Sequence, residues 1–193
     1  MTSKGEKGIL TLYSDVQATS VRWLWYPFIA VGKITLLQGD PGDGKSTMMM
    51  NLIAELSKGG TMPDGKQVGI PQKIIYQCSE DDASDTIKPR LLRAGADCSR
   101  VAYIDDQEQS LTLDDTRLED TIQATGARLL VLDPIQAFIG PECDFQNASK
   151  MRGTLRHLAS VAERHSCAVV LVGHMNKASG GKHLYRGLGS IDI

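Results

Sequence analysis

Several features that would place this 193-residue chain in a special class are scarce or missing. Its four cysteines, Cys78, Cys98, Cys143 and Cys167, show no C-x-x-C spacing, so the pattern indicates neither a zinc site nor a disulfide framework. A reduced, cytoplasmic setting is therefore expected. No apolar run approaches the length of a membrane span, and no basic segment followed by an apolar one opens the chain, which argues against a membrane protein.

The chain also has no large excess of positive or negative charge, because its formal net charge is only −2. A nearly neutral chain has no bulk electrostatic attraction to DNA or RNA, so any nucleic-acid contact must be local. Hydrophobic residues make up 41% of the chain and charged residues 23%, which is ordinary for a soluble globular protein and argues against disorder. The length suits one domain with a sizeable core.

Aromatic residues are few, at 5%, and both tryptophans stand in the segment "VRWLWYPFIA" (21–30) with a tyrosine and a phenylalanine. We expect this cluster to pack on the core. Residues 1–20 are polar and lack a clear period, so we expect an N-terminal segment followed by a single domain over 21–193. The last ten residues, "LYRGLGSIDI", start another element without completing it, which predicts that C-terminal elements of the sheet are missing.

Apolar segments that suit strands alternate with segments that suit helices from residue 33 onward. We expect strands at 33–38, 73–78, 101–104, 128–133 and 167–173, and helices at 45–57, 85–94, 115–125 and about 148–164. Near-continuous apolar strands separated by helices are typical of a parallel sheet that is covered on both faces. The predicted fold is an α/β fold with a mostly parallel, twisted sheet.

The segment "GDPGDGKST" (39–47) fits G-x-x-x-x-G-K-[ST] and lies between a predicted strand and a predicted helix. Its glycines let the backbone turn N–H groups toward phosphates, and the helix N-terminus adds its positive dipole end. Lys45 would reach the β- and γ-phosphates, and the Ser46 hydroxyl would ligate Mg²⁺. The predicted nucleotide-binding residues are Gly39, Asp40, Pro41, Gly42, Asp43, Gly44, Lys45, Ser46 and Thr47. The two aspartates are expected to turn their side chains away from the phosphates.

A phosphate loop of this kind requires a carboxylate at the end of a neighbouring apolar strand. Asp133 in "LLVLDP" follows four hydrophobic residues and would hold Mg²⁺ directly or through water, while Pro134 ends the strand. A helix cap is the alternative for an aspartate in this position. The phosphate loop favours the metal site.

The nucleotide is predicted to be ATP. A GTPase reads guanine with N-K-x-D, whereas "NKAS" (176–179) places Ser179 where the aspartate should be. The segment "DPIQ" also lacks the glycine of a D-x-x-G switch.

Two further side chains follow predicted strands at the edge where open α/β sheets bind ligands. Glu80, in "SEDD", is the candidate base for hydrolysis, and a solvated acidic turn or helix cap is the alternative. His174, in "HMNK", is placed to sense the γ-phosphate, and a capping or surface histidine is the alternative.

These motifs together resemble the RecA-like ATPases, and more closely the RepA-type replicative helicases and related AAA-labelled ATPases. The resemblance runs from "WLWYPFIAVGKITLLQGDPGDGKST" through "SEDD", "LLVLDPIQAFIG" and "LVGHMNK" to "RGLGS". It implies that Glu80 is the catalytic glutamate, Asp133 the Walker B residue and His174 the γ-phosphate sensor. It also implies a homo-oligomeric ring, typically a hexamer, with ATP between subunits. An arginine would then reach across from the neighbouring subunit, either Arg186 or one beyond Ile193.

In RecA-like proteins the loops that correspond to 139–150 and 175–189 line the DNA channel. The second segment carries Lys177, Lys182, His183 and Arg186 among glycines, with Tyr185 available for stacking on a base, which suits single-stranded DNA. A basic surface loop without a ligand is the alternative for both. The leading hypothesis is a DNA-directed ATPase motor, and the competing one is a nucleotide-switched, ring-forming regulator that acts on protein partners. A small-molecule kinase would need an arginine-bearing lid, which the sequence does not clearly contain.

Overall fold

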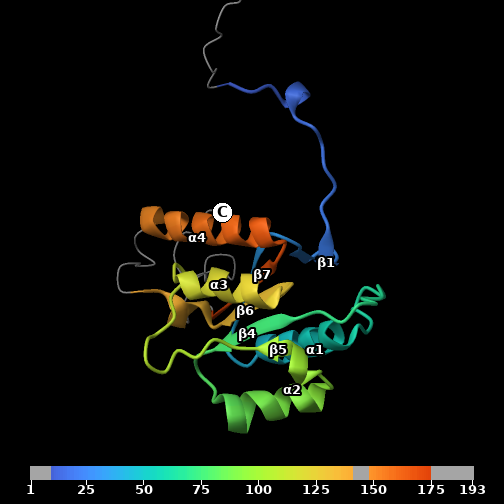
Figure 1. Ribbon diagram of the computed structural model, residues 1–193, viewed down its shortest axis with the longest axis vertical. Coiled ribbons are helices and arrows are strands. Elements are labelled where there is room, and N and C mark those ends of the chain that lie inside the picture. Colours follow the sequence, from blue (N-terminus) through green and yellow to red (C-terminus); the bar gives the residue numbers. More distant parts are fainter. Residues whose placement is uncertain (1–9, 141–147, 175–193) are drawn as a thin grey trace, which may run out of the picture.

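A five-stranded parallel sheet forms the centre of the computed structural model, which describes residues 10–140 and 148–174 (Figure 1). The strands of this sheet are β3 (Ile34–Gly39), β4 (Ile74–Cys78), β5 (Val101–Ala102), β6 (Leu129–Asp133) and β7 (Ala168–His174). Their order across the sheet is β3-β7-β6-β4-β5, and each neighbouring pair is parallel. A separate antiparallel pair, β1 (Trp23–Trp25) with β2 (Ile29–Ala30), precedes it.

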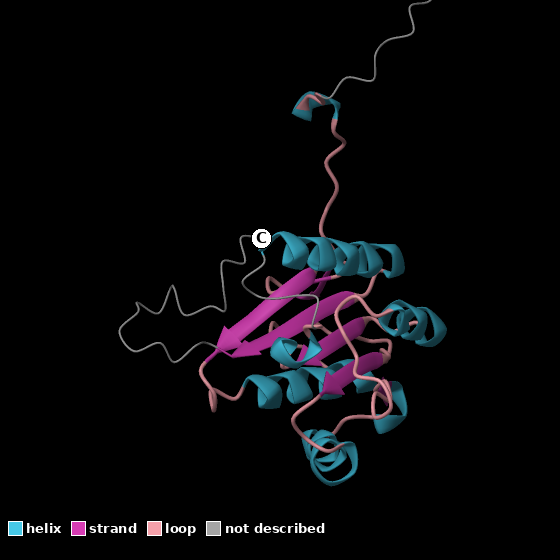
Figure 2. Cartoon of the chain, turned by 90° about the vertical axis from the view of Figure 1, so that its left-hand side faces the viewer, coloured by secondary structure: helices cyan, strands magenta, loops and turns pink. Residues whose placement is uncertain are grey.

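Helices cover both faces of the sheet, as Figure 2 shows. The α-helices are α1 (Lys45–Lys58), α2 (Lys88–Ala94), α3 (Thr116–Thr125) and α4 (Ala148–His165). Short 3-10 turns are η1 (Tyr13–Asp15), η3 (Cys98–Arg100) and η4 (Ile135–Phe138), and a π-helical turn, η2 (Ala83–Ile87), leads into α2. The predicted fold class, a parallel α/β sheet between two helical layers, is confirmed.

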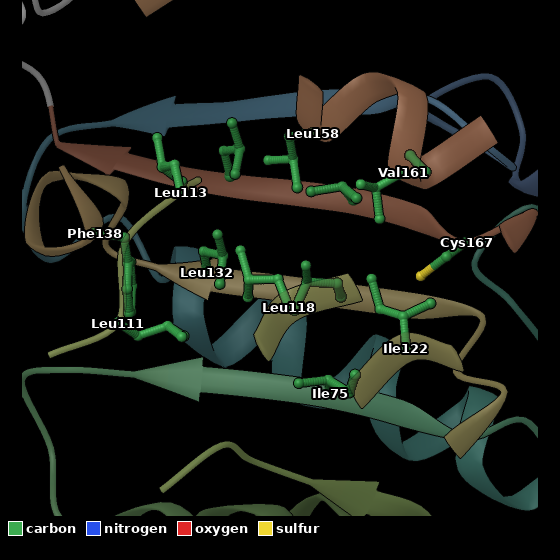
Figure 3. Packing of buried hydrophobic residues seen from close by; sticks show 14 of the residues in the cluster. Ile75, Leu111, Leu113, Leu118, Ile122, Leu132, Phe138, Leu158, Val161 and Cys167 are labelled. Atoms are coloured by element: carbon green, nitrogen blue, oxygen red, sulfur yellow. The ribbon is translucent and has the colours of Figure 1, made fainter. Parts of the chain in front are cut away.

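The two faces of strands β4, β6 and β7 belong to different hydrophobic clusters, since successive side chains point to opposite sides of a strand. On β6, Leu130 and Leu132 belong to the cluster that contains residues of α3 and α4, and Figure 3 labels Leu132, Leu118 and Leu158 in this cluster. Leu129 and Val131 lie in the cluster on the other face, which contains α1 residues such as Met49. Both faces of β6 are therefore buried from solvent.

Most element boundaries lie within two residues of the prediction, but two segments differ. The helix expected at 85–94 is divided into η2 and α2, and Asp82 caps η2 by accepting hydrogen bonds from the N–H groups of Ser84 and Asp85. Pro89, which has no N–H, stands in the first turn of α2.

The strand expected at 101–104 stops at Ala102 because a side chain replaces the backbone partner further on. The Gln77 side chain donates through Nε2 to the carbonyl oxygen of Ile104 at 3.0 Å, and its Oε1 accepts from the Ile104 N–H at 2.8 Å. This buried amide pairs both backbone groups of Ile104 where the β-ladder has ended.

The aromatic segment packs on the core only in part, which corrects the prediction made for 21–30. Leu24 and Trp25 pack against the cluster on the α1 face, whereas more than half of the surface of Tyr26 and of Phe28 is exposed. Residues 10–22, drawn in blue, extend away from the sheet (Figure 1). No helix within 10–140 or 148–174 is long and apolar enough to cross a membrane.

Candidate nucleotide site

The strand ends that carry the predicted site residues lie at one edge of the sheet. In the β3–β7 ladder Gly39 pairs with His174, and in the β4–β6 ladder Cys78 pairs with Asp133. The phosphate loop, the histidine, the aspartate and Glu80 therefore leave the sheet at its carboxyl edge. Open α/β sheets bind ligands at this edge.

The phosphate loop follows β3 and leads directly into α1. Gly42 and Gly44 have φ angles of +92° and +80°, which side-chain-bearing residues rarely adopt, so the sharp turn needs glycine at both positions. The Asp43 carboxylate turns back onto the loop and accepts a hydrogen bond from the Asp40 N–H at 2.6 Å. A Cβ on Gly39 would lie only 2.7 Å from Oδ2 of the same carboxylate, so a larger residue there would require the Asp43 side chain to shift.

The Lys45 side chain is folded back onto the loop that precedes it. Only 8% of its surface is exposed, and its Nζ donates to the carbonyl oxygens of Gly39 at 3.0 Å and Asp40 at 2.8 Å. Contact with phosphates would require the ammonium group to exchange at least one of these carbonyls for a phosphate oxygen. The neighbouring Ser46 is half-buried in the first turn of α1.

Asp133 lies two strands from the phosphate loop rather than on the strand next to it, because β7 is inserted between β3 and β6. Its side chain follows Val131 by two residues and so belongs to the α1 face of the sheet, and Ser46 lies in the first turn of α1. Asp133 is 3% exposed. The expectation of a neighbouring strand is thus wrong, while the shared face agrees with a shared metal site.

Tyr76 is a site residue that the sequence analysis missed. Its hydroxyl donates to Oδ2 of Asp133 at 3.0 Å, in a contact that is buried on both sides. Burial, together with the adjacent Asp133 carboxylate, raises the pKa of Tyr76, so the phenol stays protonated and remains a donor. The available signal was a lone hydroxyl inside the otherwise apolar start of "IIYQC".

The structure brings Glu80 and His174 together, although 94 positions separate them in the sequence. Nε2 of His174 lies 3.6 Å from Oε1 of Glu80. The other ring nitrogen, Nδ1, is buried and has no hydrogen-bond partner within the described ranges. On the same histidine, the carbonyl oxygen accepts a hydrogen bond from the Gln136 side chain at 3.2 Å.

The acids that follow Glu80 have structural partners of their own. Asp81 pairs with Arg90 at 2.7 Å, and Asp82 caps η2. Hydrogen bonds from Ser84, first from its hydroxyl and then from its N–H, lower the pKa of Asp82, which stays ionised as a cap. In this acidic turn Asp81 therefore makes the ion pair and Asp82 makes the cap. Glu80 makes the contact with His174.

The chain matches a known protein family over most of its length. A model of the family described as "AAA domain" matches residues 10–180. The chain belongs to this family. The geometry above and this match make it a P-loop ATPase domain of RecA-like type.

Curated relatives of this AAA domain carry the name DNA repair protein RadA. The protein from Streptococcus pneumoniae is 28% identical over 152 residues, which cover 77% of this chain and 31% of the relative. The protein from Chlamydia muridarum is 26% identical over 152 residues, covering 76% and 29%. The protein from Mycobacterium tuberculosis is 25% identical over 152 residues, covering 77% and 28%. The chain thus spans about a third of the length of these relatives.

The oxygen ligands that the AAA domain offers suit Mg²⁺ held jointly with a nucleotide. No group of three or more histidine, cysteine or acidic side chains that could hold a metal occurs in the part of the chain that the structure describes. Ser46 and Asp133 would supply two protein oxygens, and Mg²⁺ usually completes its six positions with phosphate oxygens and water. Ser46 and Asp133 are therefore of a type that fits a metal ion held together with a nucleotide.

Several predicted residues of the AAA domain lie outside the described ranges. These are Lys177, Ser179, Lys182, His183, Tyr185 and Arg186, together with most of the segment 139–150. Their assignments as DNA contacts or as the cross-subunit arginine stay predictions.

Proposed function

We propose that this AAA domain binds Mg·ATP, hydrolyses it with Glu80 as the base, and couples turnover to single-stranded DNA as a helicase or recombination-type motor. The observation that carries the proposal is the contact between Glu80 and His174 at the carboxyl edge, beside the phosphate loop. It joins the candidate base to the strand that continues into the basic segment 175–189.

In the proposed mechanism, Lys45 and the loop amides would bind the phosphates, and Ser46 and Asp133 would hold the metal ion. Mg²⁺, when bound, offsets the charge that develops on the phosphate oxygens. Glu80 would orient a water molecule and accept its proton, and 62% of its side-chain surface is exposed and accessible to water. His174 would respond to the γ-phosphate by changing its contact with Glu80, so that the nucleotide state reaches the segment after β7.

The proposed DNA substrate has two supports. The relatives are named as DNA repair proteins, and the chain places lysine, arginine and tyrosine side chains directly after His174. We further propose that the core at 21–193 works in the cytoplasm as a homo-oligomeric ring, with Arg186 as the arginine that completes a neighbour's site. A RepA-type replicative role is the finer form of this proposal.

ATP hydrolysis with and without single-stranded DNA tests the proposal on this chain. Glu80→Gln should leave ATP binding intact and lower turnover about 10²- to 10⁴-fold, because the amide keeps the shape and loses the proton acceptor. The matched control is Glu163→Gln, at an exposed glutamate on α4, which should hydrolyse like the wild type. Normal turnover in Glu80→Gln would favour the acidic-turn alternative. Glu80-dependent turnover that ignores DNA would favour a protein-directed switch.

A further inference from the structure

Tyr76 and Asp133 are joined by the geometry of the sheet. In the β4–β6 ladder Tyr76 pairs with Val131, two residues before Asp133 on the same face. The phenol therefore extends along the strand direction toward the carboxyl edge and reaches Oδ2 of Asp133 at 3.0 Å. Within 10–140 and 148–174 the Asp133 carboxylate accepts no other hydrogen bond.

Packing restricts the tyrosine ring. Tyr76 is 3% exposed and lies in the hydrophobic cluster that contains Met49 and Ile53 of α1 and Val131 of β6. A ring enclosed by neighbouring apolar side chains has few accessible rotamers, so its hydroxyl is held at one place at the end of the strand.

When a hydrogen bond holds one oxygen of a buried carboxylate, the direction of the other oxygen is restricted as well, because the group is planar. The Tyr76 hydrogen bond to Oδ2 restricts rotation of the Asp133 carboxylate about its terminal bond and leaves Oδ1 for another ligand. Hydrogen bonds to metal-ligating carboxylates typically hold ligands in the binding geometry, and their loss costs about 10- to 100-fold in metal affinity or activity.

We propose that Tyr76 is a positioning residue for the metal site, which orients Asp133 so that one carboxylate oxygen faces the Mg²⁺ of the bound nucleotide. This inference rests on the proposed function, since it takes Asp133 as a metal ligand. It assigns a role in the ATPase site to a hydroxyl that touches neither nucleotide nor metal.

The test measures metal affinity rather than turnover. Free Mn²⁺ is followed by electron paramagnetic resonance while the protein is titrated in the presence of a saturating non-hydrolysable ATP analogue, with Mg²⁺ as competitor. Tyr76→Phe keeps the ring and removes the hydroxyl, and should weaken Mn²⁺ binding about tenfold. Affinity for the analogue in EDTA should be unchanged, because the phosphate loop is intact.

Three control variants separate positioning from general damage. Tyr103→Phe removes the hydroxyl of an exposed tyrosine and should bind Mn²⁺ like the wild type. Tyr76→Met fills the space with a flexible apolar side chain and should match Tyr76→Phe if the hydroxyl is responsible. In an Asp133→Asn background, Tyr76→Phe should add little, because both changes act on one carboxylate.

Wild-type Mn²⁺ affinity in Tyr76→Phe would overturn the inference, and so would a full additive effect in the double variant. A lower melting temperature with unchanged metal affinity would show a structural role alone. If Asp133→Asn itself leaves Mn²⁺ affinity unchanged, the metal-site assignment in the proposed function fails as well. A change in Asp133→Asn without one in Tyr76→Phe refutes only the role of Tyr76.

Discussion

The ammonium group of Lys45 has partners here that differ from those its proposed role requires. It donates to two carbonyl oxygens of the phosphate loop, at Gly39 and Asp40, and is almost fully buried. A buried cation needs such partners, since an unpaired charge away from water is costly. The lysine therefore also stabilises the loop in the conformation described, and nucleotide binding would replace these contacts with phosphate oxygens.

Lys45→Ala should consequently affect both binding and stability. We expect loss of ATP-analogue binding, measured by fluorescence titration, because the proposed phosphate contact is gone. Removal of charged hydrogen bonds should also lower the free energy of unfolding by about 1–3 kcal/mol, measured with urea. Lys58→Ala, at the exposed end of α1, is the matched control and should retain binding. Normal ATP binding by Lys45→Ala would contradict the loop assignment.

At the scale of the elements, side chains pair backbone groups at the places where strands end and helical turns begin. Gln77 pairs both backbone groups of Ile104 beyond the end of β5, and Asp82 caps η2. The first of these interactions holds the segment after β5 against the sheet, next to the strand that leads to Glu80. A buried amide with both of its groups paired stabilises the fold only while both partners are present.

Gln77→Leu tests the two hydrogen bonds between the Gln77 side chain and the backbone of Ile104. The substitution leaves the N–H and the carbonyl of Ile104 unpaired in a buried place, so the free energy of unfolding should fall by about 1–3 kcal/mol for each group. Urea denaturation measures the change. Gln107→Leu, at an exposed glutamine, is the control and should stay within about 0.5 kcal/mol of the wild type. Equal stability of the two variants would mean that the Ile104 groups find other partners.

At the scale of the whole molecule, the phosphate loop lies at one side of the sheet. Among the strands within 10–140 and 148–174 its strand, β3, stands first in the sheet order, and β7 alone separates it from the strand of Asp133. In the proposed ring a neighbouring subunit's Arg186 would complete this site, as an arginine supplied by a second protein does in other P-loop sites.

Mixing two inactive variants tests this arrangement. Arg186→Ala should bind ATP but hydrolyse it slowly, while Lys45→Ala should not bind it. If the arginine acts across subunits, mixed rings contain interfaces with an intact lysine on one side and an intact arginine on the other. Turnover of the mixture should then exceed the sum of the separate samples at equal total concentration. No recovery on mixing would contradict a cross-subunit role for Arg186.

Much of this protein can be predicted from the sequence, because its strongest signals are local. The spacing of glycines with Lys45, the apolar run before Asp133 and the alternation of strands with helices each depend on neighbouring residues. From them follow the α/β class, the position of the phosphate loop and the emergence of Asp133, Glu80 and His174 at one edge of the sheet.

Tertiary structure decided what depends on strand order and on packing between distant segments. The insertion of β7 between β3 and β6, the approach of Glu80 to His174, and the hydrogen bond from Tyr76 to Asp133 each join residues far apart in the chain. No local pattern encodes such contacts, because strand order follows from how all the helices and strands together bury their apolar faces. The sequence by itself thus determined which residues reach the site edge, and the assembled sheet decided which of them meet.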